Sequence, residues 1–436
     1  MITTLGRRRK REEGQIRRMS EGEPKQPEMN IGTAGHVDHG KSTLVQALTG
    51  IWPEKHSEEL RRGITIKLGY ANAELRKCPK CPEDDPECYT TRKKCPKDGS
   101  ETILLRKISF VDCPGHDTLM ATMLAGSTLM DAALLVIASN EPVPQPQTRE
   151  HLVALKIMGV KQIIAVQTKI ELVPDEEAIK HYEAIVEYLS TELEEVPPVI
   201  PVSALHGVNL GYLIKEMVER FKPPERDPSL PPQMYVARSF DVNKPGTKPE
   251  NLKGGVLGGT IIQGQFKVGD EIEILPGLYH EGKYRPLTTE IISLRSENID
   301  LEYARPGGLI GVGTKLDPAL TKADYMVGNV VGLPGELPPV WEYVDAKCVF
   351  LERVVGLKEE LSVQKPDVRT LIELNVGTAT VPAIVESKSA EDVYGLRLKI
   401  PICAEVGQRM AISMRISGRW RLVGYGFIQG GKEYRY

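Results

Sequence analysis

Gly35-His36-Val37-Asp38-His39-Gly40-Lys41-Ser42 is the stretch that decides the fold of the first part of the chain. It fits the pattern G-x-x-x-x-G-K-[ST], in which backbone N–H groups of a glycine-rich loop surround phosphate groups at the N-terminus of a helix. The apolar segment 31–34 before it predicts a strand, and segment 42–49 predicts the helix. The order of strand, loop and helix therefore predicts a nucleoside triphosphate site rather than an ordinary glycine turn.

The residues of this phosphate loop have different expected roles. Lys41 is expected to reach the β- and γ-phosphate oxygens as a positive charge, and the hydroxyl of Ser42 is expected to ligate Mg²⁺. We expect the nucleotide to contact the run that continues into the helix: His36, Val37, Asp38, His39, Gly40, Lys41, Ser42 and Thr43.

A second phosphate motif, Asp112-Cys113-Pro114-Gly115-His116, follows the apolar run 108–111. In this D-x-x-G pattern, Asp112 is expected to hold Mg²⁺ through a water, and the N–H of Gly115 to contact the γ-phosphate. The imidazole of His116 is expected to orient the attacking water. No role is predicted for the other histidines outside the phosphate loop, His151 among them.

The polar loop Arg62-Gly63-Ile64-Thr65-Ile66 supplies the remaining expected residues. The hydroxyl of Thr65 is expected to join the Mg²⁺ shell when a γ-phosphate is present, which closes the loop over the nucleotide. Val37 and Ile64 are predicted to form an apolar gate that holds His116 away until a partner triggers hydrolysis. The full magnesium set is Ser42, Asp112, Thr65, Asp38 and Gly63, and the full catalytic set is His116, Gly115, Asp38, Val37 and Ile64.

Two later segments predict that the base is guanine. Thr168-Lys169-Ile170-Glu171 follows the strand-like run 163–167, and Ser203-Ala204-Leu205 follows the run 199–202. The carboxylate of Glu171 can accept the N1–H and N2–H of guanine and has nothing comparable to offer adenine. The usual motif is N-K-x-D, so Thr168 lacks the amide that would tie the base to the phosphate loop, which points to a reduced affinity.

Four cysteines lie in a polar, proline-rich insert, 78–99. Cys78, Cys81, Cys88 and Cys95 have the spacing C-x2-C-x6-C-x6-C. Four thiolates so close together favour a structural Zn²⁺ with tetrahedral coordination. Because the second pair is spaced more widely than usual, a degenerate knuckle without metal and a surface disulfide remain alternatives.

Composition limits the class of protein. The chain has 436 residues, of which 41% are hydrophobic and 26% charged, as in soluble globular proteins of two to four domains. The sequence has no apolar run of the roughly 18 residues that span a bilayer, and its charged start lacks a secretion signal, so a cytoplasmic protein with no membrane partner is expected. The net charge is −3, but residues 396–436 hold eight basic residues against two acidic ones. This basic end indicates either a phosphate-binding surface or a solvated strand face.

The chain is expected to be multidomain. In residues 29–222, strand-like runs alternate with amphipathic helical patterns, which predicts an α/β GTP-binding domain with a doubly wound, mostly parallel sheet. A proline-rich linker, 223–232, ends this pattern. The period then changes to two, which predicts two antiparallel β-barrels, domain II in 233–339 and domain III in 340–436. Residues 1–28 are expected to form a disordered basic tail.

These motifs resemble a known family. G-H-V-D-H-G-K-S, R-G-I-T-I and D-C-P-G-H-D, followed by two barrel-like segments, are similar to the translational GTPases built like elongation factor Tu. The cysteine insert, the segment 238–246 and the segment 311–318 (G-V-G-T-K-L-D-P) narrow the resemblance to the gamma subunits of archaeal/eukaryotic translation initiation factor 2, in the archaeal form. The resemblance covers residues 29–436.

The resemblance implies a function that the residues alone do not. It implies a slow GTPase that carries methionylated initiator tRNA to the small ribosomal subunit and its mRNA complex, with GTP hydrolysis as the release switch. It also implies a heterotrimer, with the beta subunit on the GTP-binding domain and the alpha subunit on domain II. The expected ligands are GTP or GDP with Mg²⁺, and structural Zn²⁺.

Other functions remain open on sequence alone. A general elongation factor for aminoacyl-tRNA would share the nucleotide site, but is not expected to carry the cysteine insert. The regulatory GTPase subunit of a sulfate adenylyltransferase has the same three-domain plan. A nucleotide-bound scaffold that hardly turns over is a weaker third alternative.

Overall fold

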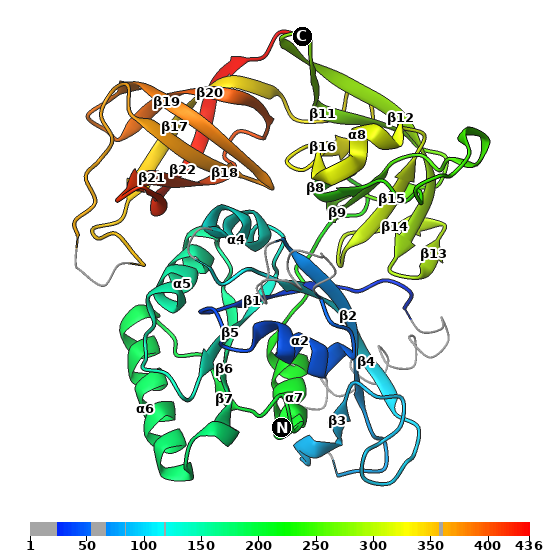
Figure 1. The fold of residues 1–436 in the computed structure, drawn as a ribbon, viewed down its shortest axis with the longest axis vertical. Helices are drawn as coiled ribbons and strands as arrows, with labels where there is room; N and C mark the ends of the chain where they lie inside the picture. The colour runs from blue at the N-terminus through cyan, green and yellow to red at the C-terminus, as the bar shows by residue number, and fades with distance from the viewer. Residues whose placement is uncertain (1–23, 54–66, 83, 117–118, 357–360) are drawn as a thin grey trace, which may run out of the picture.

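The computed structural model describes residues 24–53, 67–82, 84–116, 119–356 and 361–436. These residues form an α/β domain (domain I, β1 to β7) and two β-barrels (domain II, β8 to β16, and domain III, β17 to β22). Figure 1 shows the two barrels side by side against the same side of domain I. Among the described residues, no helix combines the length and apolar character that a membrane span requires.

Domain I is built on a seven-stranded sheet in the order β3-β2-β4-β1-β5-β6-β7. From β4 to β7 the strands are parallel, and β2 and β3 extend the sheet as antiparallel neighbours. The strands are β1 (Asn30–Ala34), β2 (Gly69–Lys77), β3 (Tyr89–Thr90), β4 (Ile103–Asp112), β5 (Ala132–Ala138), β6 (Gln162–Thr168) and β7 (Val199–Pro201). β5 is apolar and buried along its whole length, as expected of a strand with both faces covered.

Helices cover both faces of this sheet. One face packs against α2 (Lys41–Thr49) and α7 (Leu210–Arg220). The other packs against α4 (Met120–Ser127), α5 (Pro146–Met158) and α6 (Asp175–Glu192). The prediction of a doubly wound, mostly parallel sheet is therefore confirmed.

Domain II is a closed antiparallel barrel, because β11 pairs with both β16 and β12. Its six strands are β8 (Gln233–Phe240), β9 (Val256–Gln263), β11 (Glu271–His280), β12 (Lys283–Ser296), β15 (Ile310–Thr314) and β16 (Val330–Gly332). The short strands β10 (Phe266–Lys267), β13 (Ile299–Leu301) and β14 (Tyr303–Ala304) and the helix α8 (Pro318–Thr321) complete the domain.

Domain III is a second closed barrel, in the order β17-β20-β19-β18-β21-β22. The strands are β17 (Val340–Phe350), β18 (Leu371–Val376), β19 (Ala379–Lys388), β20 (Val393–Cys403), β21 (Arg409–Ile416) and β22 (Arg419–Glu433). In β17, Val344, Ala346 and Cys348 are buried while Lys347 between them is exposed, which is the period-two pattern of a barrel wall. Both predicted barrels are confirmed.

Domain III packs on the helical face formed by α4 and α5, and two arginines of the basic C-terminal end lie in this interface. Arg409 donates a hydrogen bond to the carbonyl of Ile157 at 2.7 Å. Arg421 forms an ion pair with Glu150 at 3.2 Å, with both side chains buried. These two residues therefore stabilise the contact between the domains and do not belong to an exposed basic surface.

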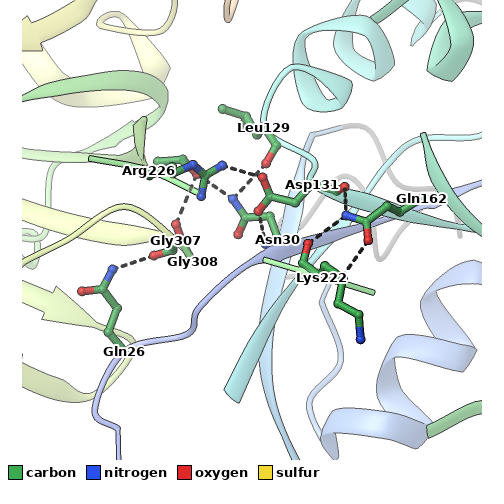
Figure 2. A network of polar contacts seen from close by, with 10 residues as sticks. Gln26, Asn30, Leu129, Asp131, Gln162, Lys222, Arg226, Gly307 and Gly308 are labelled. Carbon is green, nitrogen blue, oxygen red and sulfur yellow. Dashed lines mark hydrogen bonds and ion pairs between the residues drawn. The ribbon is translucent and has the colours of Figure 1, made fainter. Parts of the chain in front are cut away.

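Domain II is attached to domain I near Asp131, at the amino ends of the parallel strands (Figure 2). The backbone N–H of Asn30 donates to Asp131 at 2.8 Å, and the side-chain amide of Asn30 donates to Thr260 of domain II at 3.0 Å. Arg226 of the proline-rich linker also pairs with Asp131. One buried carboxylate thus joins the sheet and the linker, beside the contact with the second domain.

The segment just before β1 is ordered, which corrects the expected extent of the N-terminal tail. Gln26 donates to the carbonyl of Gly307 in domain II at 2.6 Å, and the N–H of Glu28 donates to the carbonyl of Lys107 at 2.9 Å. Residues 24–28 therefore bridge domains I and II instead of belonging to a disordered tail. Residues 1–23 lie outside the described residues.

Candidate nucleotide-binding site

The phosphate loop connects β1 to α2 at the carboxyl edge of the sheet, where open α/β sheets bind ligands. α2 begins at Lys41, after Gly40 in the left-handed conformation (φ 84°). The ammonium group of Lys41 is buried and donates to the carbonyls of Gly35 at 3.0 Å and His36 at 2.7 Å. A buried positive charge thus lies beside the N-terminus of a helix, where phosphate groups bind.

Gly115 of the D-x-x-G motif lies against this loop, because β4 and β1 are parallel neighbours. A Cβ atom at Gly115 would lie 2.4 Å from the Nζ of Lys41, 2.9 Å from the backbone N of Val37 and 3.0 Å from the carbonyl oxygen of Gly35. Only glycine allows this approach without displacing the loop. The structure therefore brings the two predicted phosphate motifs together.

The residues predicted for magnesium are partly assembled around Asp112. The hydroxyl of Ser42 donates to one carboxylate oxygen of Asp112 at 2.6 Å, and the hydroxyl of Thr33 donates to the other at 2.6 Å. Asp112 is fully buried. Carboxylate and hydroxyl oxygens are the ligands that Mg²⁺ prefers, so the residues present fit this ion. Thr33 was not predicted from the sequence.

Other predicted residues of the phosphate site are only partly placed. Asp38 is exposed in the loop with a left-handed backbone (φ 61°), and His116 is half-buried directly after Gly115. Gly63, Ile64 and Thr65 lie outside the described residues. The apolar gate and the closing loop therefore stay predictions.

Thr168 ties the base-binding motif to the phosphate loop, so the expectation that this link is missing was wrong. Its hydroxyl is buried and donates to the carbonyl of His39 at 2.7 Å. The carbonyl of Thr168 accepts from the N–H of Ser139 at 2.8 Å and from its hydroxyl at 2.9 Å. A threonine hydroxyl here makes the bond that we expected to require an amide.

The two predicted base-binding segments emerge at the same edge of the sheet. β6 and β7 are parallel neighbours, and the N–H of Val202 donates to the carbonyl of Gln167 at 2.8 Å. Glu171 is exposed, and Lys169 has a left-handed backbone (φ 58°). In the second segment Ser203 is buried, Ala204 half-buried and Leu205 72% exposed. The arrangement leaves polar groups and apolar surface open to a planar base.

Two histidines take part in the phosphate loop in ways the sequence did not predict. The Nδ1 of His151, on α5, accepts the N–H of Gly35 at 2.9 Å. Burial lowers the pKa of His151 to about 3, and burial likewise lowers the pKa of His39 to about 4. Both rings are therefore neutral near pH 7. His39 contacts the carbonyl of Val136 at 3.1 Å and the carboxylate of Glu141 at 3.3 Å.

The four cysteines of the insert come together as one cluster. The sulfur atoms of Cys78, Cys81 and Cys95 lie within 4.8 Å of one another, and Cys81 forms a disulfide with Cys88. Cys78, Cys88 and Cys95 are buried. Four converging sulfurs fit the donor set of a tetrahedral zinc site once the disulfide is reduced. Zinc, a degenerate knuckle without metal and a surface disulfide therefore stay the predicted alternatives.

We expect Thr168→Val to weaken GDP binding by about tenfold, because valine keeps the shape of threonine but leaves the buried carbonyl of His39 without this donor. Thr168→Asn, which restores the usual residue of the motif, is the matched control and should bind at least as tightly as the unmodified chain. Isothermal titration with GDP measures both. Equal affinities for the valine variant and the unmodified chain would contradict the role assigned to this hydroxyl.

Three family models match consecutive parts of the chain. "Elongation factor Tu GTP binding domain" matches residues 26–223, "Elongation factor Tu domain 2" matches residues 254–332, and "Initiation factor eIF2 gamma, C terminal" matches residues 343–428.

Close relatives carry a single name, "Translation initiation factor 2 subunit gamma". The protein from Methanocaldococcus jannaschii is 56% identical over 410 residues, which covers 93% of this chain and 98% of the relative. The protein from Pyrococcus abyssi is 55% identical over 409 residues, with the same coverage. The protein from Methanopyrus kandleri is 54% identical over 412 residues.

Solved structures of more distant proteins share the fold. A bacterial selenocysteine-specific elongation factor is 22% identical with a TM-score of 0.71, over 93% of this chain and 59% of that chain. Elongation factor SelB from Methanococcus maripaludis, solved with the GTP analogue GPPNHP, is 23% identical with a TM-score of 0.68, over 94% of this chain and 81% of that chain. With relatives more than 50% identical along nearly their whole length, the chain belongs to the gamma subunits of translation initiation factor 2, which are translational GTPases.

Proposed function

We propose that this GTPase binds methionylated initiator tRNA in its GTP state, delivers it to the small ribosomal subunit with its mRNA, and releases it after hydrolysis. The name that the relatives share supports an initiation factor over a general elongation factor and over a sulfate adenylyltransferase subunit. The proposal places the protein in the cytoplasm, as part of a heterotrimer with the alpha and beta subunits of the same factor.

In this proposal, the chain's own residues detect the γ-phosphate. Lys41 would leave the carbonyls of Gly35 and His36 to bind phosphate oxygens, and Ser42 and Asp112 would hold Mg²⁺, which neutralises phosphate charge. The N–H of Gly115 would contact the γ-phosphate, and His116 would orient the water that attacks it. Loss of the γ-phosphate removes these contacts and lets the loops around it relax.

The observation that carries the proposal is the link between domain II and the residues directly after the loop that holds Thr65. Lys67 forms an ion pair with Asp324, and the carbonyl of Leu68 accepts a hydrogen bond from Arg238 at 3.0 Å. Arg238 also contacts Asp324 at 3.0 Å. In this proposal, a rearrangement of the loop would be transmitted to domain II through these contacts, and a phosphate-dependent switch would thereby change how tightly a tRNA is bound.

Retention of acylated tRNA by the assembled heterotrimer tests this function. With a non-hydrolysable GTP analogue, methionylated initiator tRNA should be retained on a filter far better than with GDP, and better than an elongator tRNA charged with methionine. Asp324→Asn weakens the link to domain II and should reduce the difference between the two nucleotide states. Equal retention of the initiator tRNA in both states would contradict the proposal.

We also propose that the cysteine insert binds one structural Zn²⁺ through Cys78, Cys81, Cys88 and Cys95. The convergence of the four sulfurs supports it, because a small loop-rich segment with little apolar core gains stability from a metal. The zinc would hold the insert against α7, with which β3 and the 3₁₀ turn Pro86–Cys88 are in contact.

Metal analysis of chain purified without added metal should find about one zinc per chain. Cys78→Ser should lose most of this zinc, whereas Cys403→Ala, a change in domain III, should keep it. A different result would support the disulfide: no zinc, and five instead of seven free thiols after unfolding without reductant.

A further inference from the structure

His151, on α5, lies against the start of the phosphate loop. Its ring is 1% exposed, and its Nδ1 accepts the N–H of Gly35, the first glycine of the loop, at 2.9 Å. Because Nδ1 accepts this bond, the ring proton must be on Nε2. The neutral imidazole is thus a fixed acceptor, supplied to the loop by another element of the fold.

This hydrogen bond acts on the backbone of Gly35, which has little freedom to move. Its backbone has a φ of 141°, and a Cβ there would lie 2.2 Å from the carbonyl oxygen of Val136 in β5. Its N–H points to His151, while its carbonyl accepts the ammonium group of Lys41. These two groups belong to the successive peptide units that meet at the Cα of Gly35, so the bond to His151 fixes the backbone at the start of the loop, next to the carbonyl that accepts Lys41.

Contacts between α5 and domain III hold the helix, and with it His151, in place. The neighbouring Glu150 is fully buried and pairs with Arg421 of domain III, and Ile157 further along the helix accepts a bond from Arg409. The helix is thus fixed to the C-terminal barrel by a buried ion pair and by a partly buried hydrogen bond, one on each side of its middle. The Nδ1 of His151 is therefore held in place by contacts that do not involve the nucleotide.

We propose that His151 is a positioning residue for the phosphate loop, which fixes the N–H of Gly35 and thereby the backbone of the loop that surrounds the phosphates. It touches neither the nucleotide nor the reacting atoms. The proposal relies on nucleotide binding by the GTPase domain and not on tRNA delivery, so the tRNA assay above and the experiment below can fail separately.

Variants at position 151 distinguish the role of the hydrogen-bond acceptor Nδ1 from the packing of the ring. Asparagine places its carbonyl oxygen near the position of Nδ1, glutamine places its terminal group near Nε2, and leucine has no acceptor. We expect His151→Leu and His151→Gln to release a fluorescent GDP derivative about tenfold faster than the unmodified chain, whereas His151→Asn stays within about twofold. Stopped-flow displacement by excess GDP measures the dissociation rate in the full chain.

A change elsewhere on the same helix provides the control for packing. Ile157→Val removes a buried methyl group from α5 but no acceptor of the loop, and its release rate should stay close to that of the unmodified chain. The proposal is overturned if asparagine and glutamine release GDP at the same rate, or if Ile157→Val is as fast as His151→Leu. Because asparagine and glutamine differ by one methylene, their comparison holds even where the leucine variant folds poorly.

Discussion

Arg421→Ala will destabilise the contact between domains I and III by about 3–5 kcal/mol, because it removes a buried cation from beside the buried carboxylate of Glu150. Desolvating a carboxylate is costly, and the guanidinium at 3.2 Å compensates for that cost only while the interface is closed. Hydrogen exchange of the α5 amides measures the effect, since the exchange rate reports the free energy of local opening.

Two further variants distinguish the effect of leaving a buried charge unpaired from the effect of shortening an arginine side chain. Arg397→Ala removes an arginine from an exposed pair with Glu386, and it should leave the exchange of α5 nearly unchanged. The double variant Arg421→Met with Glu150→Gln removes both charges. It should recover much of the interface stability that Arg421→Ala loses. Slow α5 exchange in Arg421→Ala, as in the unmodified chain, would show that the pair does not hold the domains together.

Gly115→Ala should weaken nucleotide binding by about 1–3 kcal/mol, which is roughly 5- to 150-fold in affinity. The added Cβ would lie 2.4 Å from the Nζ of Lys41 and 2.9 Å from the backbone N of Val37, so the loop or the D-x-x-G segment must move. GTP should lose more affinity than GDP, because the γ-phosphate lies between the two segments in the proposed mechanism. Titration with a GTP analogue and with GDP measures both constants.

Gly311→Ala is the matched control for this change. Gly311 lies in β15 of domain II, and a Cβ there would have its nearest neighbours at 3.9 and 4.0 Å. The same substitution without the clash should leave both nucleotide affinities unchanged. If Gly115→Ala bound both nucleotides normally, the close approach of the two phosphate motifs would have no role in binding.

The parts of the site that come from continuous motifs could be predicted from the sequence. Lys41, Ser42 and Asp112 lie together because each ends a strand of a parallel sheet or follows one, and such ends meet at one edge. The alternation of apolar runs likewise predicted the doubly wound sheet and the two barrels. In each case the signal is local in the sequence.

The contacts that sequence reasoning missed are made between segments far apart in the chain. His151 is 116 positions from Gly35, and the helical pattern around it indicates only that one face of α5 is buried. Thr168 was predicted to lack the link to the phosphate loop because its side chain has no amide. Its hydroxyl nevertheless reaches the carbonyl of His39, because the two loops lie close together. The basic C-terminal end was judged by composition, which cannot tell Arg421, buried in an interface, from an exposed cation.

The contacts between domains I and II lie at different distances from the phosphate site, which limits how domain II can move. Asn30 and Asp131 hold it at the amino edge of the sheet, whereas Lys67 and Asp324 hold it beside the phosphate site. The first contact lies away from the phosphate loop, and the second directly follows the segment that holds Thr65, which is predicted to respond to the γ-phosphate. In the proposed switch, release of the second contact leaves the first in place, together with the bond from the N–H of Asn72 to the carboxylate of Glu297 at 2.7 Å, so domain II could change its orientation without dissociating.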